Sequence, residues 1–147
     1  MNEREKNYIE VTRKGIHDMD ASISRRGTHF SGDVFDFMAC QFALESGYGT
    51  SELSVVYHND SGMKRPTQRK TFANNFYSHD RFAHYNSYED CYHDYLHLLL
   101  IRKPSGAEAL TIDGFMKFLV RIKYCPEPDY TTRILNIYKQ FTYGKTK

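Results

Sequence analysis

Glu45 is the residue of this 147-residue sequence whose position best fits acid-base chemistry. Val34, Met38 and Gln41 precede it by eleven, seven and four residues, so they share one face of a helix with it. Burial on that face and the unpaired carbonyl groups of the last helical turn both disfavour a carboxylate and raise its pKa. A carboxyl that is protonated near neutral pH is a general acid. The same spacing also fits a glutamate that extends into water beyond Gly47.

A second chemical pattern lies further along the chain, where His93 and His97 are separated by four residues. The segment resembles the zinc-protease pattern His-Glu-x-x-His, except that Asp94, whose side chain is one methylene shorter, stands in place of the glutamate. No third ligand follows at a recognisable spacing, and Tyr92 and Tyr95 indicate ordinary helix packing. The sequence therefore favours a site without metal and without any other cofactor.

The element that carries Glu45 is predicted to be a buried central helix. Ser31 and Asp33 are start signals, residues 30–46 are apolar on nearly every face, and Gly47 is a stop signal. A carboxyl near the end of such a helix emerges from the protein core.

The remaining segments predict further helices and one small β element. We expect one or two amphipathic helices over residues 4–25, interrupted near Gly15, and a short helix from Thr50 and Ser51 to Val56. Residues 59–70 read as a loop and residues 70–85 as an irregular β-hairpin. Three later helices are expected after Ser87, after Thr111 and after the turn at residues 124–129, with residues 103–106 ending the first of them.

Composition excludes several protein classes. A formal charge of +2 is too weak to indicate nucleic acid as a partner, and no window approaches the roughly 18 apolar residues of a membrane helix. The N-terminal residues lack the apolar stretch of a secretory signal. The cysteines have no short spacing, which favours buried thiols over a disulfide framework or a metal knuckle; they are Cys40, Cys91 and Cys125.

Residues 43–53, ALESGYGTSEL, resemble the signature of the glucosaminidases of glycoside hydrolase family 73, which hydrolyse bacterial cell walls. Asn59 with SGMK at residues 61–64 is similar to the family's Asn-Asn-Leu-Phe-Gly-Ile-Lys segment. Residues 82–99 and 123–141 are similar to its Phe-Arg-x-Tyr, Ser-x-Glu-Glu-Ser stretch and its Gly-Tyr-Ala-Thr-Asp-Pro-x-Tyr segment. The resemblance covers about residues 8–141 in the family's order, which makes it specific.

The resemblance implies which residues form a site. Glu45 matches the family's catalytic glutamate. Tyr124 matches a tyrosine that lines the substrate groove, although the family's Gly, Ala and Thr around it are replaced here. Tyr48 stands at an aromatic position and Asn59 in the matched loop, and we expect both to bind substrate.

A second catalytic group is less well defined by the sequence. Glycoside hydrolysis uses a base, a nucleophile or the substrate's own acetamido group in addition to the acid. Family members often place an acidic residue before the Phe-x-x-Tyr strand, so the resemblance implies Asp80, with Asp60 in reserve.

The expected fold is mainly helical α+β and lysozyme-like, with a small β-hairpin lobe that flanks a groove, in one domain over residues 1–147. The activity implied is hydrolysis of the β-1,4 bond between N-acetylglucosamine and N-acetylmuramic acid in peptidoglycan. Three alternatives stay open: a muramidase on the same scaffold, a silent glycan-binding module, and a zinc hydrolase using His93 and His97.

The expected partner is the peptidoglycan glycan strand, with no nucleic acid and no integral membrane segment. The basic run at residues 64–70 fits a solvated loop or one that meets acidic groups of the wall or of lipids. Synthesis in the cytoplasm without a signal peptide predicts action on the wall or in the periplasm after delivery. A phage endolysin, a phage tail, or an injection or lysis apparatus would provide that route.

Overall fold

The helix predicted around residues 31–46 is the centre of the fold. It runs from Gly32 to Ser46 as α2, and the Ser31 side chain accepts a hydrogen bond from the Val34 backbone N–H at its start. Gly47 ends it in the left-handed conformation at φ 58°. Its buried side chains lie on every face, as the apolar sequence predicted; examples are Phe35, Phe37, Met38 and Phe42.

The computed structural model describes residues 1–24, 27–66, 69, 71–73 and 81–146. Its helices are α1 (Glu3–Ile23), α2 (Gly32–Ser46), α3 (Glu52–Tyr57), α4 (Tyr88–Ile101), α5 (Gly106–Leu110), α6 (Ile112–Arg121) and α7 (Tyr130–Thr146). None of the helices in these ranges combines the length and apolarity that crossing a bilayer requires.

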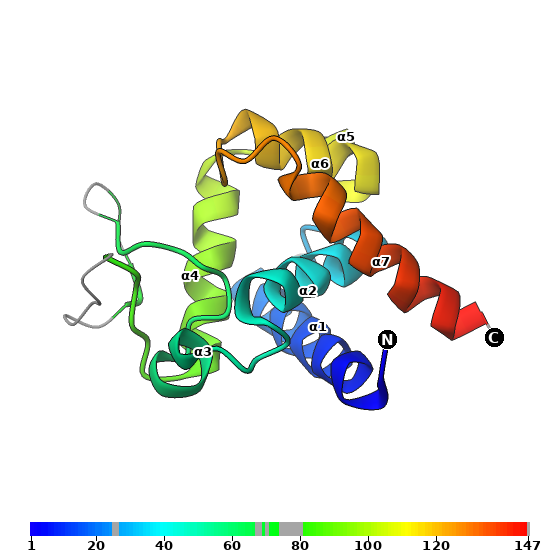
Figure 1. Cartoon of the computed structure of the whole chain (residues 1–147). Helices are drawn as coiled ribbons and strands as arrows, with labels where there is room; N and C mark the ends of the chain where they lie inside the picture. The colour runs from blue at the N-terminus through cyan, green and yellow to red at the C-terminus, as the bar shows by residue number, and fades with distance from the viewer. Residues whose placement is uncertain (25–26, 67–68, 70, 74–80, 147) are drawn as a thin grey trace.

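The other helices pack around α2. It contacts α1, α5, α6 and α7, and α1 also contacts α4. In Figure 1, α2 lies between α1 and α7, with α5 and α6 at one end and α4 at the side of the long loops. One buried apolar cluster joins these elements. The last turn of α2, which carries Glu45, is therefore held on a rigid support.

The interruption expected near Gly15 is wrong, because α1 continues through it to Ile23. A Cβ atom at Gly15 would lie 2.4 Å from Cε2 of Tyr92 on α4. The glycine therefore permits the close approach of two helices and does not end one.

A short helix was missed between the expected helices of the C-terminal half. α5 begins with a capping box in which the Ser105 hydroxyl accepts from the Glu108 backbone and the Glu108 carboxylate accepts from the Ser105 backbone. This Ser-x-x-Glu pattern is a known start signal. The predicted caps at Ser51, Ser87 and Thr111 are confirmed.

The β-hairpin lobe expected over residues 70–85 is not shown. Residues 70 and 74–80 lie outside the described residues. In the described flank the pairing is one antiparallel bridge between Lys64 and Phe82, and the Ala83 N–H donates to the Met63 carbonyl at 2.9 Å. Residues 81–83 thus pair with a segment that was predicted to be loop. The sequence does not predict this pairing, because the two segments are far apart in the chain and the hydrogen bonds between them are made by backbone groups.

The cysteines are free thiols. Cys40 and Cys91 are buried, as predicted, whereas Cys125 is only partly buried.

Asp94 on α4 ties the loop segment after residue 68 to the helical body. Its side chain is fully buried and forms an ion pair with Arg69 at 2.8 Å. It also accepts hydrogen bonds from the Tyr85 hydroxyl at 2.6 Å, the Thr71 hydroxyl at 3.0 Å and the Phe72 N–H at 3.2 Å. One carboxylate therefore anchors two stretches of loop.

Replacing Asp94 by Ala should lower the free energy of unfolding by about 3–5 kcal/mol, since breaking a buried ion pair leaves its partners desolvated and unpaired. Urea denaturation measures this loss. Asp113→Ala is the matched control, because that aspartate is 79% exposed in its pair with Lys117 and should contribute little. Equal losses for the two variants would contradict the anchoring role.

Candidate active site

Glu45 occupies the last turn of α2, one residue before the helix ends at Ser46. Its side chain is half-buried, so the carboxyl neither enters the apolar core completely nor extends freely into water. Of the two placements that the sequence allowed, the structure has the one at the edge of the core.

The backbone of Gly62 lies directly against the Glu45 carboxyl. A Cβ atom at Gly62 would be 2.3 Å from Glu45 Oε2 and 3.0 Å from its Cδ, closer than any side chain can approach. Gly62 also has φ +71°, a conformation that L-residues rarely adopt. The backbone conformation favours glycine at this position, and a Cβ atom there would displace the Glu45 carboxyl.

Asn59 holds the loop of residues 59–63 in shape. Its amide donates to the carbonyls of Met63 at 2.9 Å and Ala83 at 2.8 Å. Its carbonyl accepts from the Gly62 N–H at 3.0 Å and from both the N–H and hydroxyl of Ser61. This buried side chain, 1% exposed, fixes where Gly62 meets the acid.

Tyrosines from three segments surround Glu45. The Tyr124 ring stacks on Tyr130 with centroids 6.1 Å apart, and its hydroxyl donates to the Ser61 carbonyl at 2.9 Å. Tyr95 is edge-on to Tyr124 and donates to the Gln41 side chain, which in turn donates to the Tyr130 hydroxyl at 2.9 Å. These contacts fix the rings around the carboxyl.

The electrostatic surroundings raise the pKa of Glu45, as the sequence predicted. Burial is the main cause, and the negative charge of Glu127 acts in the same direction. A hydrogen bond with Tyr130 and the positive charge of Arg133 oppose the rise. The raised pKa favours the protonated acid, which is the form that donates a proton.

Glu45 opens onto a cavity of about 620 Å³. Glu127 is the other carboxyl that lines it among the described residues, and its partner is Arg133 at 3.1 Å. The remaining lining combines apolar and basic groups: Gly62, Met63, Lys64, Pro66, Arg69, Phe82, Leu98, Ile122, Lys123, Tyr124, Cys125 and Pro126. A cavity with a carboxyl of raised pKa, aromatic and apolar walls and basic groups suits an uncharged or acidic polymer such as a glycan.

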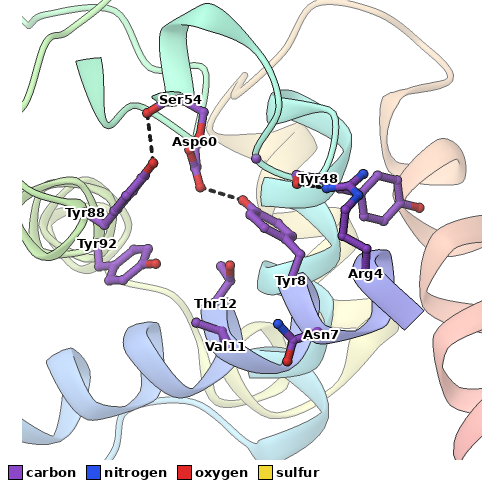
Figure 2. Close-up of a pocket in the computed structure, with 11 residues that line it drawn as sticks. Arg4, Asn7, Tyr8, Val11, Thr12, Tyr48, Ser54, Asp60, Tyr88 and Tyr92 are labelled. Atoms are coloured by element: carbon purple, nitrogen blue, oxygen red, sulfur yellow. Dashed lines mark hydrogen bonds between the residues drawn. The ribbon is translucent and has the colours of Figure 1, made fainter. Parts of the chain in front are cut away.

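Of the predicted site residues, the structure brings Glu45 and Tyr124 together in this cavity. Asn59 lies behind its wall, in the loop that carries Gly62. Tyr48 lines a separate cavity of about 330 Å³ between α1, α3 and α4 (Figure 2). Asp80 lies outside the described residues.

The histidine pair of the zinc alternative packs on one aromatic ring. His93 stacks on Phe72 at 3.8 Å and His97 meets the same ring edge-on at 6.1 Å, while Asp94 has the structural role described above. Within the described ranges, no three His, Cys, Asp or Glu side chains are arranged to hold a metal ion.

Sequence reasoning missed Gly62, Glu127 and Tyr130 as site residues. Gly62 lies inside the matched SGMK segment, and the other two stand at the Asp and the second Tyr of the family's Gly-Tyr-Ala-Thr-Asp-Pro-x-Tyr segment. The signal was present, but only the fold shows that these segments meet at Glu45.

Gly62→Ala should lower the free energy of unfolding by about 1–2 kcal/mol from its backbone conformation alone, and should also displace the Glu45 carboxyl. Thermal or urea unfolding gives the first effect. Gly106→Ala is the control, because a Cβ atom there meets nothing within 4 Å. A Gly62→Ala protein as stable as the parent would contradict the strain expected from this backbone conformation.

Comparison with known proteins shows which family the chain matches. Residues 31–143 match the family described as Glucosaminidase, mannosyl-glycoprotein endo-beta-N-acetylglucosaminidase. A search of curated proteins finds no match.

Solved structures with the same fold include bacterial hydrolase domains. The catalytic domain of the autolysin Auto from Listeria monocytogenes has a TM-score of 0.66 at 18% identity, over 100% of this chain and 89% of that one. The glycoside hydrolase domain of FlgJ from Salmonella typhimurium has a TM-score of 0.66 at 18% identity, over 99% and 92%.

A chain of a type VI secretion system effector-immunity complex from Pseudomonas protegens is also similar. It has a TM-score of 0.68 at 13% identity, over 96% of both chains. At these identities the structural likeness concerns the fold alone. The family match spans most of the chain and includes Glu45, Gly62 and Tyr124, and on that basis the chain belongs to the glucosaminidase family.

Proposed function

We propose that this protein is a peptidoglycan hydrolase that cleaves the β-1,4 bond between N-acetylglucosamine and N-acetylmuramic acid, with Glu45 as the general acid. The observation that carries the proposal is the Glu45 carboxyl, pressed against Gly62 at the wall of a cavity where burial raises its pKa. Membership of the glucosaminidase family supports a glycoside as substrate.

In this mechanism Glu45 gives its proton to the glycosidic oxygen as the bond to the anomeric carbon breaks. Positive charge develops on the sugar, and water then adds to the anomeric carbon. Tyr124, which lines the same cavity, contacts the reacting sugar. Asn59 acts through Gly62 and does not touch substrate, since its polar atoms are bonded to protein groups.

The group that assists water is proposed as Asp80 on the family resemblance. Glu127 is a second candidate because it lines the Glu45 cavity. Comparing Asp80→Asn with Glu127→Gln distinguishes the two, since only loss of the assisting carboxyl should abolish hydrolysis. Normal activity in both variants would indicate assistance by the substrate's acetamido group.

We also propose that a delivery or lysis apparatus carries the protein to the wall. The expectation of a phage endolysin gains no support from the relatives above, whereas the fold shared with a chain of a secretion effector complex is compatible with delivery by such machinery. Export of the native enzyme through a general signal-peptide pathway would contradict this route.

Glu45→Gln keeps the shape of the side chain and removes its proton, so hydrolysis should fall by roughly 10²–10⁴-fold. The measurement is release of soluble fragments from peptidoglycan, followed by borohydride reduction and mass spectrometry. Reduced N-acetylglucosamine supports the proposal, whereas reduced muramic acid would identify a muramidase.

Controls for this experiment separate the remaining alternatives. Glu52→Gln, at an exposed position in α3, should leave the rate unchanged. If Glu45→Gln releases as many fragments as the parent protein, Glu45 is not the acid. If the parent protein releases no fragments, it is a glycan-binding module. Loss of activity on chelation would favour the zinc alternative.

Activity should fall as pH rises through the raised pKa of Glu45, because the proton to be donated is then missing. The raised pKa keeps the acid protonated to higher pH than an ordinary glutamate, so activity persists above the usual carboxyl range. The pH profile of kcat/KM on a soluble glycan measures this limb. A plateau that extends far into alkaline pH would exclude Glu45 as the donor.

A further inference from the structure

Tyr8 on α1 connects the two segments that meet at Glu45. Its hydroxyl donates to Asp60 Oδ2 at 2.6 Å and lies 3.0 Å from Ser46 Oγ. Ser46 directly follows the acid, and Asp60 lies two residues before Gly62 in the loop. Figure 2 shows the Tyr8 hydroxyl directed at the Asp60 carboxylate.

Both groups that Tyr8 contacts are shielded from water, and Tyr8 itself is partly buried. Ser46 is 0% exposed and Asp60 is 2% exposed. Ser46 Oγ also donates to the Phe42 carbonyl at 2.7 Å and accepts from the Gly49 N–H at 2.9 Å, so it is part of the end of α2. Burial raises the pKa of Tyr8, which keeps its hydroxyl a neutral donor. Hydrogen bonds in such surroundings are stronger than in water.

Two anchors thus hold the loop of residues 59–63, and they act on different properties. Asn59 bonds to Ser61, Gly62 and Met63 and therefore sets the internal shape of the loop. Tyr8 donates its hydroxyl hydrogen to Asp60 in the loop, and its oxygen lies against Ser46 Oγ in the last turn of α2, so it sets the position of one segment relative to the other.

We propose that Tyr8 is a positioning residue for the acid: through Asp60 and Ser46 it holds the Gly62 backbone against the Glu45 carboxyl. The proposal rests on the proposed function of Glu45. A displacement of about 1 Å at a reacting group can reduce a rate by roughly 100-fold, so a clamp outside the substrate cavity has a measurable effect.

The clamp also governs the protonation of Glu45. If the loop moves away, water reaches the carboxyl, and the burial that raises its pKa decreases. The other groups that face Glu45 are Tyr130 and Arg133 of α7, Tyr95 of α4, and Glu127 and Tyr124 ahead of α7, with Lys64, Arg69 and Lys123 in the wider cavity. The alkaline limb of activity should therefore move to lower pH.

The test compares Tyr8→Phe with Tyr88→Phe. Both tyrosines line the cavity of Figure 2, but the Tyr88 hydroxyl donates to the Ser54 carbonyl at 3.1 Å and touches neither side of the clamp. For Tyr8→Phe we expect kcat on a soluble glycan to fall roughly 10- to 100-fold, with KM unchanged and the alkaline limb at lower pH. Tyr88→Phe should change neither kcat nor the pH profile.

A second pair of variants addresses Asp60 in the same assay. Asp60, the reserve candidate for the second catalytic group, lines the cavity of Figure 2 and not the Glu45 cavity. Asp60→Asn keeps an acceptor oxygen for the Tyr8 hydroxyl and should retain most of the activity. Asp60→Ala removes the acceptor and should reproduce the kcat and pH effects of Tyr8→Phe. Unfolding midpoints show which variants are folded at the assay temperature, and the comparison of Asp60→Ala with Asp60→Asn preserves the test if Tyr8→Phe is not.

Two results would overturn the proposal. One is a Tyr8→Phe enzyme with parental kcat and pH profile; the other is equal loss in Tyr8→Phe and Tyr88→Phe with the alkaline limb unmoved. Measuring Glu45→Gln in parallel separates these results from failure of the proposed function. Full activity in that variant would show that Glu45 is not the general acid, whatever the role of Tyr8.

Discussion

The contact between the Gly62 backbone and the Glu45 carboxyl is the constraint on which the rest of the site depends. It is made by a glycine at φ +71°, a loop with a fixed internal shape and a helix end that is capped by Gly47. Asn59 fixes the loop, and the buried faces of α2 fix the helix end. Because no side chain separates the two segments, a small displacement of either one changes the hydration of the carboxyl directly. The fold thereby controls both the position and the protonation of the acid.

Tyrosine is suited to this construction because it combines a large apolar ring with one polar atom. Tyr124 and Tyr130 stack beside Glu45, and their hydroxyls bond to the Ser61 carbonyl and to Gln41. Tyr8 does the same on the opposite side of the loop. Each ring excludes water, and each hydroxyl satisfies a buried polar group that would otherwise destabilise the fold. The high tyrosine content of the chain is therefore explained in part by the site.

The sequence predicts what local patterns encode. The caps at Ser31, Ser51 and Thr111 and the buried character of α2 follow from neighbouring residues, and so does the direction of the Glu45 pKa shift, although distant groups such as Tyr130 and Glu127 contribute to it. Gly15 was wrongly predicted to interrupt a helix, because the need for glycine at this position comes from another helix, where Tyr92 leaves no room for a Cβ atom. The pairing of residues 63–65 with 81–83 and the separation of Tyr48 from the Glu45 cavity depend equally on tertiary contacts. No spacing rule within one segment contains that information.

Burial of an acid has opposite consequences for activity and for stability. The desolvation that raises the pKa of Glu45 also disfavours its ionised form, so the folded chain is less stable whenever that carboxyl loses its proton. A protein that keeps such a group needs supporting interactions elsewhere, because sites with strained or desolvated groups reduce stability. Here the support is polar and buried: Asp94 anchors the loop beside α4, and Asn59 anchors the loop beside Glu45. These side chains stabilise the fold around the site, and Asn59 in addition shapes the loop that buries the Glu45 carboxyl.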